Sequence, residues 1–262
     1  MMVHWRLKDN GPVSSWLSST YNAGLTDSCP LTPVPCPPVA SLTIENYVKA
    51  IYQLSAGGDG QAAATGKLAE TLAVSPSTVT SMLKTLGESG LAQYTPYEGA
   101  RLTDSGRSLA LRVLRRHRLI ELFLVQTLKL TWDEVHAEAE NMEHAVSDLL
   151  VEKMDAFLGH PESDPHGDPI PRADGTIAAT AGGALSALGT GEHFRLVRVS
   201  DQTPDFLRYL ADTGLCLGAE GTIAEIRPQA GVIVLRMGTH ETTLSHEIAD
   251  KLVVTRDSPA RD

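Results

Sequence analysis

The stretch "TGKLAETLAVSPSTVTSMLKTLGESGLAQY", residues 65–94, decides the fold of the first half of this 262-residue chain. It contains two runs with apolar residues at helical spacing, separated by a turn of three or four residues near 73–75. The second run begins where Ser75 can cap a helix and Pro76 can take its first position. Its apolar stripe comprises Val79, Met82, Leu83 and Leu86. Two short helices joined in this way predict a helix-turn-helix.

The flanking sequence completes a small domain around these two helices. Residues 41–56, "SLTIENYVKAIYQLSA", place their apolar side chains on one face of a predicted helix. Residues 91–106, "LAQYTPYEGARLTDSG", form two short extended pieces around a turn with Pro, Glu and Gly, which predicts a wing. From about residue 107 to 158 the periodicity is helical, and the length suits several helices.

The remaining segments differ from this helical half in composition and in the spacing of their apolar residues. Residues 159–188 are rich in Pro and Gly, which predicts a linker. Beyond about residue 191 the short runs "HFRLVRVS", "GTIAEIRP", "GVIVLRMG", "ETTLS" and "KLVVTR", interrupted by one helical run, predict a small β-barrel. Residues 1–40 are rich in Ser, Thr and Pro and show no sustained period, so we expect a disordered Pro-rich tail.

Composition excludes several broad classes of protein. The formal net charge of −10 argues against sequence-blind binding to nucleic acid. Residues 41–112, however, carry as many basic as acidic side chains, so this segment can still face DNA. No apolar run is long enough to span a bilayer and none resembles a signal peptide, so we expect a cytoplasmic protein. The three cysteines show no C-x-x-C spacing, which argues against a zinc ribbon or a thioredoxin-like site.

The second helix of the helix-turn-helix presents small polar residues opposite its apolar stripe. Hydroxyl side chains permit close approach to a major groove, and they can bond to phosphates or base edges. Arg101 in the wing is placed to meet phosphate or the minor groove. The alternative is an ordinary helical hairpin with a polar face. The predicted DNA-binding residues are Ser75, Pro76, Ser77, Thr78, Thr80, Ser81, Lys84 and Arg101.

A second pattern, "HAEAENMEH" at residues 136–144, gathers histidines and carboxylates on one side of a helix. At 3.6 residues per turn its ligand-type side chains fall within about 100° of one another. The preceding helix carries another i, i+4 pair in "RRHRLIE", and antiparallel packing would bring the two sets together. Imidazole with carboxylate suits manganese, ferrous iron, cobalt or zinc. The candidate ligands are His117, Glu121, His136, Glu140, Glu143 and His144.

These two patterns together resemble one known family. The strings "AVSPSTVTSMLKTLGESGLAQYTPYEGARLTDSGR", "RRHRLIELFL" and "VHAEAENMEH" resemble the diphtheria toxin repressor and manganese transport regulator family over roughly residues 41–172. The C-terminal region resembles that family's SH3-like, FeoA-type domain. The implied fold is mainly α with a small β domain. Its divisions are a tail (1–40), a winged helix-turn-helix domain (41–112), a helical metal-binding and dimerisation domain (113–160), a linker (161–190) and the SH3-like domain (191–257).

The resemblance also implies which residues hold metal. In that family one site joins a residue of the first helix to three residues of the E/C-x2-E-H motif, which here are Asn46, Glu140, Glu143 and His144. A second, ancillary site uses the positions of His117, Glu121 and His136. In three-domain members the SH3-like domain contributes further ligands, whose equivalents by alignment here are Gln202 and Asp205.

This sequence departs from the family pattern in an informative way. Iron-type members offer sulfur where Glu140 and Asn46 stand, and oxygen donors shift the preference towards manganese. Manganese-type members carry a second acidic residue where Lys49 stands. The resemblance therefore implies two separate metal sites rather than a binuclear one, with Mn(II) as the bound ion and Fe(II) as the alternative.

We therefore predict a homodimeric repressor of manganese homeostasis genes that binds palindromic double-stranded operator DNA with Mn(II) as corepressor. Without metal, repulsion among the carboxylates would leave the first helix loosely held. The alternatives are an Fe(II)-dependent repressor of iron uptake genes and a winged-helix regulator whose His/Glu cluster is only a solvated face. A dimetal oxidase would need paired E-x-x-H motifs, and because the spacing here is i, i+4 or i, i+1, we predict no enzymatic activity.

Overall fold

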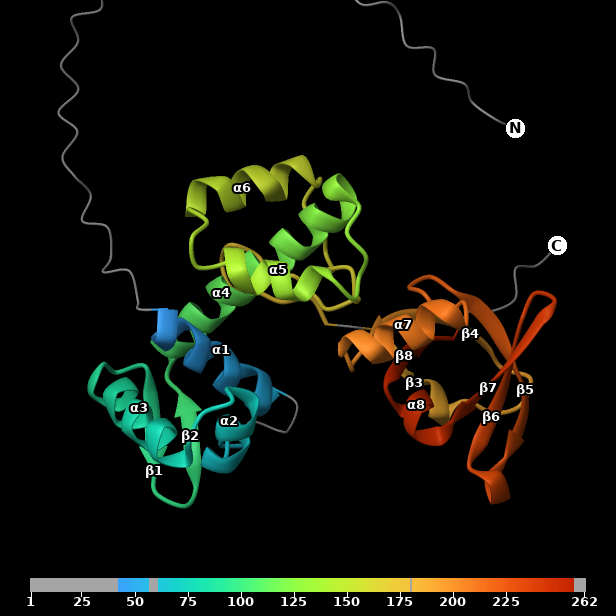
Figure 1. The fold of residues 1–262 in the computed structure, drawn as a ribbon, viewed down its shortest axis with the longest axis horizontal. Coiled ribbons are helices and arrows are strands. Elements are labelled where there is room, and N and C mark those ends of the chain that lie inside the picture. The colour runs from blue at the N-terminus through green and yellow to red at the C-terminus, as the bar shows by residue number, and fades with distance from the viewer. Residues whose placement is uncertain (1–41, 57–60, 180, 257–262) are drawn as a thin grey trace, which may run out of the picture. The chain divides into compact units, whose positions relative to one another are not determined.

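A computed structural model describes residues 42–56, 61–179 and 181–256 (Figure 1). The tail predicted at residues 1–40 lies outside the described residues. The described chain opens with a winged helix-turn-helix, as predicted. Its elements are α1 (Leu42–Ala56), α2 (Thr65–Thr71), α3 (Pro76–Glu88), β1 (Ala92–Thr95) and β2 (Gly99–Leu102).

Helix α3 begins where the sequence predicts. The Ser75 hydroxyl accepts a hydrogen bond from the Thr78 amide at 3.2 Å, and Pro76 stands in the first turn. The predicted stripe packs inward: Val79, Leu83 and Leu86 are fully buried and Met82 is partly buried. This stripe contacts Tyr47, Val48 and Ile51 of α1 in one hydrophobic core. The core fixes α3 on α1, so the opposite face of α3 is left exposed.

The wing is an antiparallel hairpin of β1 and β2 with Tyr97 at its tip. A third piece of chain joins it, because Ala63 and Ala100 exchange both backbone hydrogen bonds, at 2.8 and 3.0 Å. Gly99 has a φ of +107°, and a side chain there would lie 2.4 Å from the Ala63 carbonyl oxygen. Glycine is therefore required at the point where the wing meets the segment before α2.

The predicted long helical region consists of four helical pieces. They are α4 (Asp104–Phe123), a π-helical turn (Leu124–Leu128), α5 (Val135–Met142) and α6 (Asp148–Phe157). Ile120 on α4, Ala139 on α5 and Met154 on α6 share a core. Residues 159–179 contain no helix or named strand, but Ile170 packs with Leu119 in a further core. No helix in the described parts of the chain is both long and apolar enough to cross a membrane.

The C-terminal region forms a six-stranded antiparallel sheet in the order β3-β8-β4-β5-β6-β7, and the predicted fold class is confirmed. Phe194, Leu235 and Leu252 lie in its fully buried core. Its strands are β3 (Gly183–Ala184), β4 (His193–Val199), β5 (Glu220–Arg227), β6 (Val232–Met237), β7 (His240–Ser245) and β8 (Leu252–Thr255). Its helical pieces are the 3-10 turns Leu185–Ala187 and Pro228–Ala230, together with α7 (Pro204–Asp212) and α8 (His246–Asp250).

We expect Gly106→Ala to destabilise the winged domain. Gly106 lies in the first turn of α4, where an added Cβ would stand 1.9 Å from the Leu91 carbonyl oxygen. Relief of such a clash costs about 1–3 kcal/mol, which should lower the midpoint of thermal unfolding by several degrees. Gly66→Ala is the control, because a Cβ at Gly66 meets nothing within 4 Å. Equal midpoints for the two variants would contradict the packing described here.

Candidate metal centre

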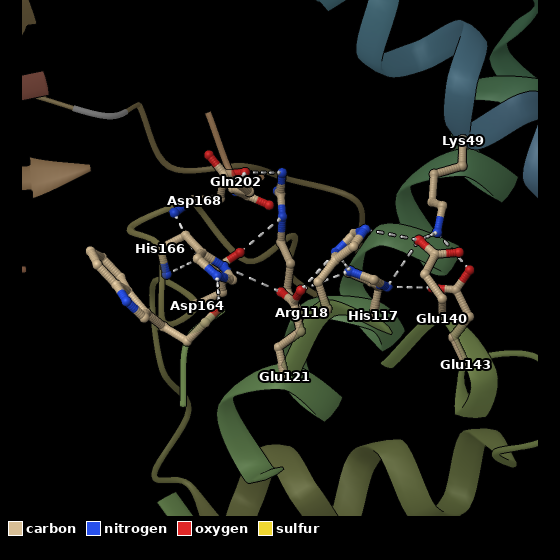
Figure 2. Close-up of polar contacts among 12 residues, drawn as sticks. Lys49, His117, Arg118, Glu121, Glu140, Glu143, Asp164, His166, Asp168 and Gln202 are labelled. Atoms are coloured by element: carbon tan, nitrogen blue, oxygen red, sulfur yellow. Dashed lines mark hydrogen bonds and ion pairs between the residues drawn. The ribbon is translucent and has the colours of Figure 1, made fainter. Parts of the chain in front are cut away.

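Two acidic side chains of the α5 region, Glu140 and Glu143, form what we call the carboxylate pair (Figure 2). Lys49 on α1 donates to Glu140 Oε1 and to Glu143 Oε1, both at 2.6 Å. On the other side, His117 Nδ1 of α4 lies 2.6 Å from Glu143 Oε2. Burial would raise the pKa of Glu143, but the hydrogen bond to His117 and the charge of Lys49 hold that pKa below its usual value. The fully buried Glu143 is therefore ionised.

Next to this pair, His144 is oriented as a metal ligand would be. Its Nδ1 lies 2.7 Å from Glu45 Oε2, so a proton on Nδ1 leaves the lone pair on Nε2. That Nε2 is buried, lies 3.1 Å from Glu143 Oε1 and has no hydrogen-bond partner. Asn46 stands on α1 beside Glu45, and its Oδ1 is likewise buried without a partner. Buried polar atoms rarely lack a partner, so both atoms are candidates to bind an ion.

The second group, which we call the histidine cluster, consists of His117, Glu121 and His136. His117 Nε2 lies 3.0 Å from Glu121 Oε1 and 3.1 Å from His136 Nδ1, which is itself 3.1 Å from that carboxylate oxygen. Burial would lower the pKa of His117, but hydrogen bonds to Glu121 and Glu143 raise it to about 9. At neutral pH both ring nitrogens of His117 are therefore protonated, and its charged ring links the cluster to the carboxylate pair.

A third group joins Glu121 to Asp164 and His166 of the segment 159–179, and their ligand atoms lie within 4.8 Å of one another. His166 Nε2 lies 2.8 Å from the Trp132 carbonyl oxygen and donates to it. The lone pair is then on Nδ1, which is buried without a partner at 3.8 Å from Glu121 Oε2. Burial, together with the charge of Glu121, raises the pKa of Asp164 to about 8. Three ligand-type side chains thus converge in one buried region.

Sequence reasoning missed Asp164 and His166. They lie in "DPHGDP", residues 164–169, which we interpreted as part of a linker because of its prolines and glycine. The available signal was the alternation of Asp, His and Asp within five residues. The structure shows why it matters: Asp164 and His166 are both buried, so this segment packs as core rather than as a surface connection.

The two residues expected from the SH3-like domain take different positions. Gln202 donates to Asp168 Oδ2 at 3.1 Å, and Asp168 also accepts from Arg118 at 3.2 Å, so Gln202 contacts a neighbour of the third group (Figure 2). Asp205 has a side chain that is 97% exposed and pairs with Arg208. The structure therefore does not bring Asp205 together with the other candidate ligands.

The predicted DNA-binding residues share the outer side of α3 and the wing. Ser77, Ser81 and Lys84 are exposed, as are Ser75, Pro76, Thr78 and Arg101. Thr80 is half-buried, and its hydroxyl donates to the Pro76 carbonyl oxygen at 2.9 Å. The face opposite the buried stripe is thus open along its length, as an element that enters a major groove must be.

Comparisons with known proteins match most of the described chain. Residues 41–100 match the family "Iron dependent repressor, N-terminal DNA binding domain", residues 103–172 match "Iron dependent repressor, metal binding and dimerisation domain", and residues 184–256 match "FeoA domain". The "Iron-dependent repressor IdeR" of Mycobacterium leprae is 31% identical over 230 residues, which cover 82% of this chain and 97% of the relative. The "Diphtheria toxin repressor" of Corynebacterium diphtheriae is 28% identical and covers 79% and 94%.

Solved structures agree with these matches. A "Manganese-dependent transcriptional repressor complex with manganese" is 39% identical, covers 81% of this chain and 99% of that one, and gives a TM-score of 0.74. "ScaR with bound Zn2+" is 32% identical, covers 82% and 99%, and gives a TM-score of 0.69. The fold and these matches define a class, the metal-dependent transcriptional repressors. This chain belongs to the iron-dependent repressor family, which includes the diphtheria toxin repressor.

We expect Mn(II) binding to tighten as the pH rises from about 6.5 to 8.5, by up to about tenfold per pH unit for each proton displaced. Asp164 and His117 both have raised pKa values, about 8 and about 9, so each holds a proton below that pH. A metal ligand must be deprotonated, so an ion held by these two side chains would expel the protons. Calorimetry in two buffers of different ionisation enthalpy measures the protons released.

The matched variant for this prediction is Asp164→Asn, which removes one titrating group while it keeps the shape of the side chain. Its affinity should be weaker and should depend less steeply on pH than that of the wild type. A wild-type affinity for Mn(II) that does not change over this pH range would show that the ion displaces no proton from Asp164 or His117.

Proposed function

We propose that this chain is a manganese-dependent repressor of manganese homeostasis genes, with Mn(II) as corepressor. The observation that carries the proposal is the set of buried lone-pair donors without partners beside ionised carboxylates, namely Asn46 Oδ1, His144 Nε2 and His166 Nδ1. A divalent ion would satisfy such donors and would supply positive charge to carboxylates. The residues present therefore fit a divalent metal ion.

The donors support Mn(II) as the ion. All of the clustered ligand-type groups in the described residues offer oxygen or nitrogen, and none contains a cysteine. Oxygen donors with imidazole favour Mn(II) over the softer metals that prefer sulfur. Fe(II) is the alternative, because relatives named for iron dependence match as much of this chain as the manganese-dependent structure does.

The proposed sites group as follows. The primary site would be formed by Asn46, Glu140, Glu143 and His144, and the ancillary site by His117, Glu121 and His136. Asp164 and His166 extend the ancillary site through Glu121, and Gln202 approaches it through Asp168. A site that joins α1 to α5 would hold the DNA-reading domain, proposed at 41–112, on the helical domain, proposed at 113–160.

The proposed partners are a palindromic operator and a second copy of the chain. Helix α6 exposes Leu149, Leu150 and Phe157, and apolar side chains gathered on one helix are typical of a surface that binds another protein. A two-fold dimer would present two α3 helices to half-sites one or more turns of DNA apart. A repressor that binds operator DNA must have access to the chromosome, so we propose that the protein is located in the cytoplasm.

We expect His144→Ala to abolish metal-stimulated DNA binding while the fold and the dimer persist. The variant removes the Nε2 donor, yet the backbone of the α5 end does not depend on that side chain. Fluorescence anisotropy against duplexes selected from a random pool with Mn(II)-loaded wild type measures the response, and sedimentation checks the dimer. Glu143→Gln should also lose the response of DNA binding to metal, because an amide is a weaker ligand than a carboxylate.

The control for this prediction is His193→Ala, because His193 lies on β4 of the SH3-like domain and belongs to none of the metal-type clusters. A wild type that binds the selected duplex equally well with excess chelator and with Mn(II) would contradict metal dependence. A full response to Mn(II) in His144→Ala would show that the primary site lies elsewhere.

We expect Lys84→Ala to reduce the salt dependence of operator binding. Each phosphate contact contributes about −0.9 to the slope of log K against log salt, and a dimer carries two copies of Lys84, so the slope should lessen by about 2. The measurement is DNA affinity over a series of salt concentrations. Arg227→Ala removes the same charge from an exposed position in the SH3-like domain and should leave the slope unchanged. An unchanged slope in Lys84→Ala would mean that this side chain meets no phosphate.

A further inference from the structure

Lys49 is a basic side chain that lies between the two members of the carboxylate pair. Its ammonium group contacts Glu140 and Glu143 at 2.6 Å each, and its side chain is only 8% exposed (Figure 2). The two contacts cross from α1 to the α5 region, 91 and 94 residues further along the chain. A lysine this buried is uncommon unless it is paired, so its position is set by these carboxylates.

Lys49 leaves part of its surroundings unsatisfied. Glu143 has both oxygens engaged, Oε1 by Lys49 and Oε2 by His117. The neutral donors nearby, Asn46 Oδ1 and His144 Nε2, remain without partners. The ammonium group of Lys49 donates to the two carboxylates and to neither of these atoms, whereas a metal ion could bind their lone pairs together with the carboxylates. Lys49 therefore supplies positive charge to the carboxylates of the primary site, while the other two ligand atoms of that site remain without a partner.

We propose that Lys49 is a resident cation of the primary site, which balances the carboxylate pair in the metal-free protein and competes with the divalent ion for it. This inference rests on the proposed function, because it concerns the same site. The ammonium group occupies the carboxylate oxygens that a divalent ion at this site would bind. The ion must therefore displace Lys49. The lysine thus raises the concentration of free metal at which the primary site fills, and it ties α1 to the α5 region before any metal binds.

The test compares Lys49→Met with the wild type. Methionine keeps the length and the apolar stem of the side chain but removes the charge. Differential scanning fluorimetry in excess chelator measures the metal-free protein, and calorimetric titration of the stripped protein with MnCl2 measures affinity. We expect a melting midpoint that is several degrees lower without metal, an affinity for Mn(II) that is tenfold or more higher, and a larger rise of the midpoint on saturation.

Three controls separate charge from packing. Lys49→Arg keeps the charge and should resemble the wild type more than Lys49→Met does. Lys67→Met removes an exposed lysine that pairs with Glu70, and it should change neither measurement. Lys49→Gln keeps a hydrogen-bond donor for the carboxylates, so it replaces Lys49→Met in the titration if that variant folds only when metal is present, and its affinity should likewise exceed that of the wild type.

An affinity of Lys49→Met or Lys49→Gln equal to or weaker than that of the wild type would overturn the proposal. Neither measurement contains DNA, so the outcome is separate from that of the proposed function. A wild type that binds no Mn(II) beside a Lys49→Met that does would support the resident cation and contradict the proposed manganese response. Variants and wild type that all fail to bind the ion would overturn both.

Discussion

The interaction on which the helical half depends is the burial of one ionised carboxylate. Glu143 has no exposed surface, and a charge in that position is tolerated only with partners of opposite charge. His117 from α4 and Lys49 from α1 supply them, so this one side chain contacts two further helical elements. Removal of one partner would leave an uncompensated buried charge, which costs about 3–5 kcal/mol. The polar centre thus also links α1, α4 and the α5 region.

This arrangement changes the electrostatic mechanism that the sequence suggests. We expected the carboxylates to repel one another without metal and to leave the first helix loosely held. In the structure, cations of the protein itself stand between those carboxylates, and α1 already contacts the α5 region through Lys49 and through Glu45. Metal binding would then exchange one set of contacts for another rather than create order from repulsion.

Local signals predicted most of the fold, because they act over a few residues. Ser75 and Pro76 marked the start of α3, and short extended runs marked the positions of β4 to β8. The i, i+4 pair of His117 and Glu121 was visible for the same reason. Asp164 and His166 were missed because a segment rich in Pro and Gly has no period to show that it is buried. The partners of Lys49 lie some 90 residues away, a separation that spacing cannot span.

The contact between Trp132 and His166 has an optical consequence. The two rings stack with centroids 6.4 Å apart at 12°, and the carbonyl oxygen of Trp132 orients the imidazole. The other tryptophans of the chain, Trp5 and Trp16, lie far from these residues in the sequence. An indole held against a candidate ligand would sense a paramagnetic ion or a change in the imidazole as a change in its emission. Trp132 would thus serve as a built-in fluorescent reporter of the proposed ancillary site, without any added label.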